Sequence, residues 1–166
     1  MESDLLRIFD VLERAGVKYL VVGGVAVVLH GHLRVTADVD LVIKLEPANV
    51  RVAMQALASL GFRPRAPVPI EQFADAEART SWIQEKGLTV FSLWSPSMPG
   101  AEVDVFVAEP FDFDSTYARA LRADIEGVQV TVVALDDLIA LKRAAGRVKD
   151  DEDVRVLLAL KDEADD

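Results

Sequence analysis

The chain has 166 residues, 51% of them hydrophobic, and a formal net charge of −10. This length is typical of one globular domain with a substantial core, so we expect a single domain over residues 1–166. The absence of cysteine excludes disulfides and thiolate metal sites, two histidines make a histidine-based zinc site a poor candidate, and the acidic balance disfavours broad non-specific DNA binding.

The first half of the chain alternates helical and extended patterns. Ser3 is a suitable cap for a first helix, and Pro47 suits the first turn of a later one. The pattern predicts helices at 4–15, 24–30 and 48–60, and strands at 18–22 and 37–45.

The second half begins with a segment, 62–87, that three prolines interrupt and in which we expect only a short helix at 70–77. The turn-rich stretch 95–100 predicts a hairpin between two strands. The remaining pattern predicts strands at 88–93, 102–107 and 128–133, a helix at 114–122, and a C-terminal helix pair at 135–145 and 150–160, within about 135–163. No apolar run reaches the length of a membrane span, so we expect a cytoplasmic protein.

Two glycines, Gly23 and Gly24, fall where the first predicted strand turns into a helix. Glycine lets a phosphate approach the backbone closely, and the free N–H groups at a helix start favour an anion. A glycine pair alone marks many ordinary turns. The pair therefore indicates a phosphate site only together with the acidic residues of the next predicted strand.

Asp38 and Asp40 lie in that strand, in a segment of valine, leucine and isoleucine. Alternate side chains of a strand project from one face, so both carboxylates share a face. Two like charges there repel each other, and a divalent cation relieves this; hard oxygen ligands with room for water and phosphate suit Mg²⁺. Arg34 and Thr36 share the parity of the two aspartates and extend the polar row toward a nucleotide.

These residues resemble the signature of the polymerase-β-type nucleotidyltransferase superfamily. The fuller string is similar to small stand-alone members, including the abortive-infection-type toxin nucleotidyltransferases. The resemblance covers about residues 17–158. It rests on Gly23-Gly24-Val25-Ala26, His30-Gly31, Arg34-Val35-Thr36, Asp38-Val39-Asp40-Leu41, Val103-Asp104-Val105, and the block from Leu141 to Asp150 with Asp153 beyond. One departure is Gly24, where many members have a serine whose hydroxyl reaches phosphate.

The resemblance implies an α/β (α+β) fold with a mixed sheet and helices mainly on one face. It implies Mg²⁺-dependent transfer of an NMP group from an NTP, ATP among them, to an acceptor hydroxyl. Asp38, Asp40 and Asp104 would hold one or two Mg²⁺ ions, with Mn²⁺ as a substitute. Gly23, Gly24, Arg34, Thr36 and Lys142 would bind the nucleotide. The acceptor stays open between tRNA, a protein and a small-molecule alcohol, and a toxin role would add an antitoxin partner.

Several alternatives remain at the sequence level. Glu102 shares the parity of Asp104 and is a competing ligand. Lys142 is either a phosphate ligand or a surface lysine whose stem lies along apolar residues. For Arg147 we favour an ion pair with Asp150 or Asp153. For the whole chain, the alternative to an enzyme is an inactive nucleotidyltransferase-like module that binds nucleotide or a partner protein.

Overall fold

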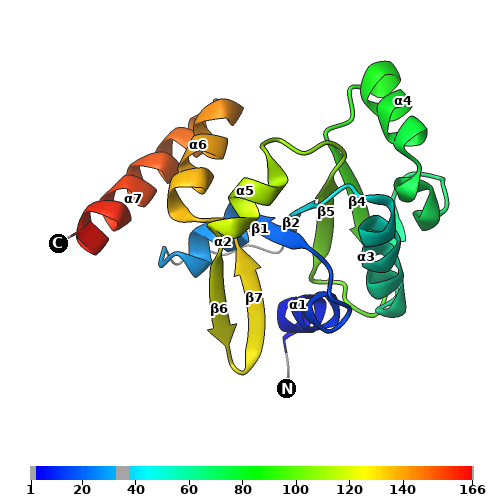
Figure 1. Ribbon diagram of the computed structural model, residues 1–166, viewed down its shortest axis with the longest axis horizontal. Helices are drawn as coiled ribbons and strands as arrows, with labels where there is room; N and C mark the ends of the chain where they lie inside the picture. Colours follow the sequence, from blue (N-terminus) through cyan, green and yellow to red (C-terminus); the bar gives the residue numbers. More distant parts are fainter. Residues whose placement is uncertain (1–2, 33–37, 166) are drawn as a thin grey trace.

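The computed structural model describes residues 3–32 and 38–165 (Figure 1). Arg34 and Thr36, two of the predicted nucleotide-binding residues, lie outside these ranges. The described helices are α1 (Asp4–Arg14), α2 (Gly23–Leu29), α3 (Pro47–Ser59), the 3-10 helix η1 (Ile70–Ala74), α4 (Ala76–Lys86), α5 (Phe113–Ala118), α6 (Leu135–Ala145) and α7 (Val148–Asp165). The described strands are β1 (Tyr19–Val22), β2 (Asp38–Ile43), β3 (Arg63–Pro64), β4 (Val90–Trp94), β5 (Glu102–Phe106), β6 (Leu121–Ile125) and β7 (Val128–Val132).

The described strands form one mixed sheet in the order β3-β4-β5-β2-β1-β7-β6. Strand β2 pairs parallel with β5, and β1 pairs parallel with β7, while the other neighbours pair antiparallel. The antiparallel pairing of β4 with β5 is the hairpin that the turn-rich 95–100 stretch predicts. A mixed sheet with helices confirms the predicted fold class.

The half of the sheet formed by β4, β5 and β2 has two unlike faces. On one face, the fully buried side chains are apolar: Val39, Leu41, Phe91, Leu93, Val103 and Val105. Helices cover this face, because Phe91 stacks on Phe73 of η1 with ring centroids 5.1 Å apart and on Trp82 of α4 at 5.2 Å. The alternate residues of the same strands therefore project from the opposite face.

The predicted helix at 114–122 is wrong in its second half. Helix α5 ends at Ala118, and residues Leu121–Ile125 form strand β6 in a hairpin with β7. Glu126 and Gly127 join the two strands with φ of 52° and 86°. Two successive positive φ angles are the feature of a type I′ hairpin turn, which the Glu-Gly pair permits.

Helix α4 is longer than the predicted short helix at 70–77. The Asp75 side chain accepts a hydrogen bond from the Glu77 N–H at 3.0 Å and so caps the helix start. Gly87, with φ of 61°, ends it. The apolar pattern of this helix is weak, because Trp82 is its main contribution to the core. Hydrophobic periodicity alone therefore does not reveal the helix.

The C-terminal helix pair, α6 and α7, is present as predicted (Figure 1). Lys161 of α7 contacts Asp136 of α6 at 2.9 Å, so the end of α7 lies beside the start of α6. Helix α6 also packs against α2. No helix in the described ranges is long and apolar enough to span a membrane.

Candidate active site

Four carboxylates lie on the face of the sheet opposite the apolar one. The parallel register of β2 and β5 places Asp38 beside Glu102 and Asp40 beside Asp104. Neighbours in register share a face, and residues two apart in one strand do as well. Asp104 therefore projects from the same face as Asp38 and Asp40, next to Asp40. The alternative ligand, Glu102, belongs to this acid row as well, next to Asp38.

Asp104 has an unusual environment. Its Oδ1 is the one buried side-chain oxygen or nitrogen of the described residues that has no hydrogen-bond partner. Burial raises the pKa of Asp104 above its ordinary value, a hydrogen bond from Ser92 opposes this, and the charges of Glu102 and Asp38 raise the pKa further. An oxygen buried without a partner is costly, and a bound cation would satisfy it.

The carboxylates do not form a closed cage. In the described part of the chain, no group of three or more acidic or histidine side chains is already arranged around a common metal position. That Asp38, Asp40 and Asp104 share one divalent ion therefore stays a prediction.

Gly23 is packed directly against Asp40. A Cβ at Gly23 would lie 2.1 Å from Asp40 Oδ2 and 2.8 Å from its Cγ, and the φ of Gly23 is 69°. Both the space and the backbone angle require glycine here. The turn from β1 to α2 thus brings the first glycine of the pair against the second aspartate, which links the two halves of the sequence motif.

Lys142 of α6 is buried between the C-terminal helices. Its Nζ donates hydrogen bonds to Asp153 at 3.0 Å and to Asp150 at 3.4 Å, both on α7. The three side chains are at most 8% exposed. Lys142 is therefore not a surface lysine, and its ammonium is occupied by two carboxylates.

Arg147, in the turn between α6 and α7, forms the ion pair that we favoured. Its Nε donates to Asp150 Oδ2 at 2.6 Å and its Nη2 to Asp150 Oδ1 at 3.3 Å. The Asp150 side chain is fully buried, whereas the Arg147 side chain is 60% exposed. One side of the pair therefore faces the helices and the other faces solvent.

A cavity of about 390 Å³ adjoins the acid row at Asp38. Its lining comes from the start of β2, the segment after β3, and the turn between β4 and β5: Asp38, Arg65, Trp94, Ser95, Pro96, Met98, Pro99, Gly100, Ala101 and Glu102. Arg65 and Glu102 form an ion pair through Nε and Oε1 at 2.5 Å. The Arg63 guanidinium lies 5.5 Å from the Trp94 ring centroid. This size is typical of a small-molecule site.

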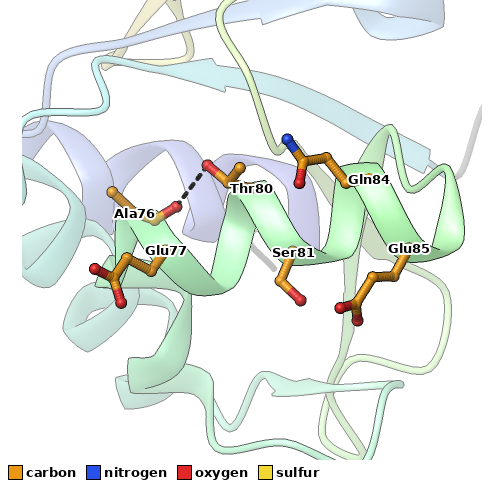
Figure 2. Close-up of a pocket in the computed structure, with 6 residues that line it drawn as sticks. All are labelled: Ala76, Glu77, Thr80, Ser81, Gln84 and Glu85. Atoms are coloured by element: carbon orange, nitrogen blue, oxygen red, sulfur yellow. Dashed lines mark hydrogen bonds between the residues drawn. The ribbon is translucent and has the colours of Figure 1, made fainter.

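A second cavity, of about 330 Å³, lies along α4 and is lined by Ala76, Glu77, Thr80, Ser81, Gln84 and Glu85 (Figure 2). These residues all come from one helix, and the Thr80 hydroxyl is bonded to the Ala76 carbonyl. Helix α4 covers the apolar face of the sheet through Trp82. This cavity is therefore on the other side of the sheet from the acid row.

The sequence interpretation did not assign Ser92 to the site. Ser92 faces Asp104 across the antiparallel β4–β5 pair. The face from which Ser92 projects follows only from the register of the β4–β5 hairpin. The sequence does not give the length of the turn, and so it does not give this register. Trp94 and Arg65, which the sequence interpretation also did not assign to the site, line the cavity with Asp38.

Solved structures share this fold. The chain aligns with the lincomycin-bound lincosamide antibiotic adenylyltransferase LnuA at 15% identity and a TM-score of 0.61, over 96% of this chain and 98% of that one. It aligns with ANT(2″)-Ia in complex with adenylyl-2″-tobramycin at 14% identity and a TM-score of 0.59, over 93% and 86%. An antigenic nucleotidyltransferase-like protein from Paracoccidioides brasiliensis aligns at 17% identity and a TM-score of 0.51, over 96% and 77%.

A comparison with curated proteins finds no match. A family model described as "Nucleotidyltransferase of unknown function (DUF6036)" matches residues 3–162. This match spans both parts of the motif, the acid row and the C-terminal helix pair. The chain therefore belongs to this nucleotidyltransferase family, as the Gly-Gly and Asp-x-Asp residues predicted, and with it to the transferases.

Proposed function

We propose that the protein transfers an NMP group from an NTP to an acceptor hydroxyl and releases pyrophosphate, with Mg²⁺ as the cofactor. The observation that best supports this is the register of β2 and β5, which sets Asp40 beside Asp104 with Gly23 against the Asp40 carboxylate. This combines a glycine turn and an acid row at one place on the sheet. In the transfer, a bond forms between the acceptor oxygen and the α-phosphorus while the bond to the pyrophosphate oxygen breaks.

The residues present fit a divalent cation. Carboxylate oxygens are the ligands that Mg²⁺ prefers, and the buried Oδ1 of Asp104 is an oxygen in need of a partner. The metal would be held by Asp38, Asp40 and Asp104. Glu102 lies next to Asp38 in the same acid row. When bound, Mg²⁺ would offset the negative charge of the triphosphate and help align it for displacement.

The protein's own groups supply the remaining steps. The Asp104 carboxylate would accept the proton of the attacking hydroxyl. Backbone N–H groups at Gly23 and Gly24 would contact phosphate oxygens, without the serine hydroxyl that many relatives have at the second position. Roles for Arg34 and Thr36 stay predictions, since both lie outside the described residues. Direct phosphate binding by Lys142 also stays a prediction, and it requires the ammonium to leave two buried carboxylates.

The cavity beside Asp38 is our candidate for the acceptor site. Its volume of about 390 Å³ suits a small molecule better than a folded RNA or protein. Of the three acceptor classes we therefore favour a small-molecule alcohol that contacts Trp94. Two structures of the same fold have lincomycin and adenylyl-2″-tobramycin bound, which is in line with this choice. A toxin role with an antitoxin partner stays a prediction of the sequence resemblance.

The experiment uses NTPs labelled at the α-phosphate, Mg²⁺, and a cell extract separated into small-molecule, RNA and protein fractions. We expect label to enter the small-molecule fraction with wild-type protein and not with Asp40→Asn. Label in RNA or protein would refute the acceptor class but keep the transfer. Nucleotide binding without any label transfer or pyrophosphate would instead support the inactive module.

A further inference from the structure

Strand β6 lies at one end of the sheet. Among the described strands it pairs only with β7, and no strand lies on its other side. Leu121, Arg122 and Asp124 of this strand are exposed, Leu121 at 42%. Figure 1 shows the β6–β7 hairpin extending away from the C-terminal helix pair. A strand in this position presents backbone N–H and C=O groups to which another strand can pair.

The backbone of β7 shows which groups bond to β6. The Thr131 N–H donates to the Tyr19 hydroxyl at 3.1 Å, and the Val133 N–H donates to the Val21 carbonyl at 3.1 Å. Tyr19 and Val21 belong to β1, which lies on the side of β7 opposite β6. Backbone groups of a strand point alternately to its two neighbours. Thr131, and Gln129 two residues before it, therefore direct their backbone groups to β1 and away from β6.

It follows that the backbone groups of Arg122 and Asp124 point toward the open edge. Arg122 lies opposite Thr131, and Asp124 lies opposite Gln129. Residues opposite each other in an antiparallel pair either exchange two backbone hydrogen bonds or exchange none. Since Thr131 and Gln129 do not bond to β6, the N–H and C=O groups of Arg122 and Asp124 face away from β7, where a further strand would pair.

The charges of β6 favour one register for a second copy of this chain. In a two-fold pair centred on Ala123, Arg122 of each copy lies opposite Asp124 of the other. Both pairs join opposite charges and exchange two backbone hydrogen bonds each. Leu121 of each copy would lie opposite Ile125 of the other, which covers its exposed side chain. A pair centred on Arg122 or on Asp124 would set like charges opposite each other, which is destabilising.

Contacts within the chain orient the two charged side chains. The Arg122 guanidinium lies 4.9 Å from the Tyr117 ring centroid, and its Nη1 donates to the Thr131 hydroxyl at 3.3 Å. Asp124 Oδ1 accepts a hydrogen bond from the Gly127 N–H at 2.8 Å. A guanidinium has five N–H donors and a carboxylate has two oxygens, so each group can bind a second partner.

We propose that β6 is the interface of a homodimer, in which two copies pair antiparallel about Ala123 and their sheets become continuous. The same patch on both copies is self-complementary, as a two-fold interface requires. The charges of the strand also disfavour pairing with an unrelated strand. In the sheet order, β7 and β1 separate β6 from β2, so the acid row lies away from this interface. The inference is independent of the proposed function.

The test measures the mass in solution of wild-type protein, Arg122→Glu, Asp124→Lys, and an equimolar mixture of the two variants. The method is size-exclusion chromatography with light scattering over a concentration series. We expect two chains for wild type and one for each variant, because each variant sets like charges opposite each other. The mixture should regain the mass of two chains, since the new glutamate then faces the new lysine while Asp124 faces Arg122.

Arg51→Glu is the matched control, because it makes the same change of charge at an exposed residue of α3. It should stay a dimer like wild type. Wild-type protein that stays a single chain at every concentration would overturn the inference. A dimer that persists in both charge variants, or a mixture of folded variants that stays monomeric, would also overturn it, since the register would not be the one centred on Ala123.

Ala123→Cys decides the case in which circular dichroism shows a charge variant to be unfolded. The chain has no cysteine, so any disulfide of this variant joins two copies. Residue 123 would face its counterpart in a pair without backbone hydrogen bonds, where Cα atoms lie about 4.5 Å apart, within disulfide range. Oxidised glutathione should link Ala123→Cys on a non-reducing gel and should not link Gln129→Cys, at an exposed position of β7. No link in Ala123→Cys, or equal linking in both variants, would overturn the inference.

Discussion

Asp40 is the residue on which the two parts of the sequence motif meet. Its carboxylate is in contact range of Gly23 on one side, and its strand neighbour on the other side is Asp104. A change at Gly23 alters the space of this region, whereas a change of Asp38 or Asp40 to asparagine alters its charge. Two predictions separate these effects.

Gly23→Ala should remove transfer activity by displacing the Asp40 carboxylate. The new Cβ would lie 2.1 Å from Asp40 Oδ2, and a positive φ at alanine costs about 1–3 kcal/mol of folding stability. Gly87→Ala is the control, because Gly87 has a φ of 61° with nothing within 4 Å of its Cβ position. Denaturant unfolding should show a loss in both variants, larger in Gly23→Ala because its Cβ also overlaps Asp40, while only Gly23→Ala should lose activity. Normal activity in Gly23→Ala would mean that the Asp40 carboxylate has no fixed role.

Asp38→Asn and Asp40→Asn should each abolish transfer and leave the metal-free protein as stable as wild type or slightly more so. Each change removes one like charge from the acid row, which relieves repulsion, and also removes a charged metal ligand. Thermal melts and pyrophosphate assays on the same samples check this. A large loss of stability would indicate a structural ion pair instead.

For single residues, the sequence was most informative where strand alternation alone determines which side chains share a face. The shared face of Asp38 and Asp40 follows from strand alternation, whereas the position of Asp104 beside Asp40 depends on long-range pairing that no local pattern encodes. The burial of Lys142 depends likewise on two carboxylates of the next helix. Our two readings of Lys142, as a surface group or a phosphate ligand, did not include this arrangement.

At the scale of elements, helices α6 and α7 are joined by two kinds of lysine contact. Lys142 lies inside the helix pair with Asp150 and Asp153, and Lys161 lies near its surface with Asp136. Removing one partner of a buried ion pair leaves an uncompensated charge, whereas an exposed pair contributes little. The two lysines therefore provide a direct comparison.

Lys142→Met should lower the free energy of unfolding by about 3–5 kcal/mol, because two carboxylates stay buried without their cation. Lys161→Met should lower it by about 0–1 kcal/mol, since its pair is largely solvated. Urea denaturation of both variants measures the difference. A similar small loss in both would show that the Lys142 cluster is open to water in solution.

Asp150 should make the protein sensitive to acid. Burial alone would raise the pKa of Asp150, but Arg147 and Lys142 outweigh it, and the pKa lies below its ordinary value. A carboxyl with a lowered folded pKa stabilises the fold above its unfolded pKa of about 4, and this contribution is lost as pH falls through the folded pKa. The stability difference between wild type and Asp150→Asn should therefore shrink between pH 7 and pH 3. A difference that stays constant would contradict the charged state of Asp150.

The elements that the sequence missed have weak local signals. Helix α4 has few apolar residues with helical spacing, and its cap at Asp75 comes after a proline-rich stretch that favours a loop. Strand β6 is short and mostly exposed, and it is fixed by pairing with β7 and by the turn at Glu126 and Gly127. Contacts with other parts of the chain determine the structure of both segments. Local propensity does not capture such contacts.

At the scale of the molecule, the two faces of the sheet have different surroundings. One face packs against η1 and α4, and the other bears the acid row, with the cavity next to Asp38. The family match and the shared fold confirm the nucleotidyltransferase recognition and the mixed-sheet fold; the metal, the acceptor and the toxin role stay predictions.

Trp94→Ala should raise the KM for the acceptor and leave NTP affinity unchanged, because Trp94 lines the cavity and not the glycine turn. Loss of a stacking face costs about 0.5–1.5 kcal/mol, so the KM should rise roughly two- to tenfold. Trp94→Phe should retain most of the affinity. The acceptor identified by labelling is the substrate for these kinetics. An unchanged KM in Trp94→Ala would place the acceptor elsewhere.

The most direct test of the central claim is pyrophosphate release by wild-type protein from an NTP, with and without Mg²⁺, in the presence of the small-molecule fraction. We expect release that requires both Mg²⁺ and the fraction and that is absent in Asp40→Asn and Asp104→Asn. Release that continues without Mg²⁺, or at the wild-type rate in either variant, would contradict transfer at the acid row.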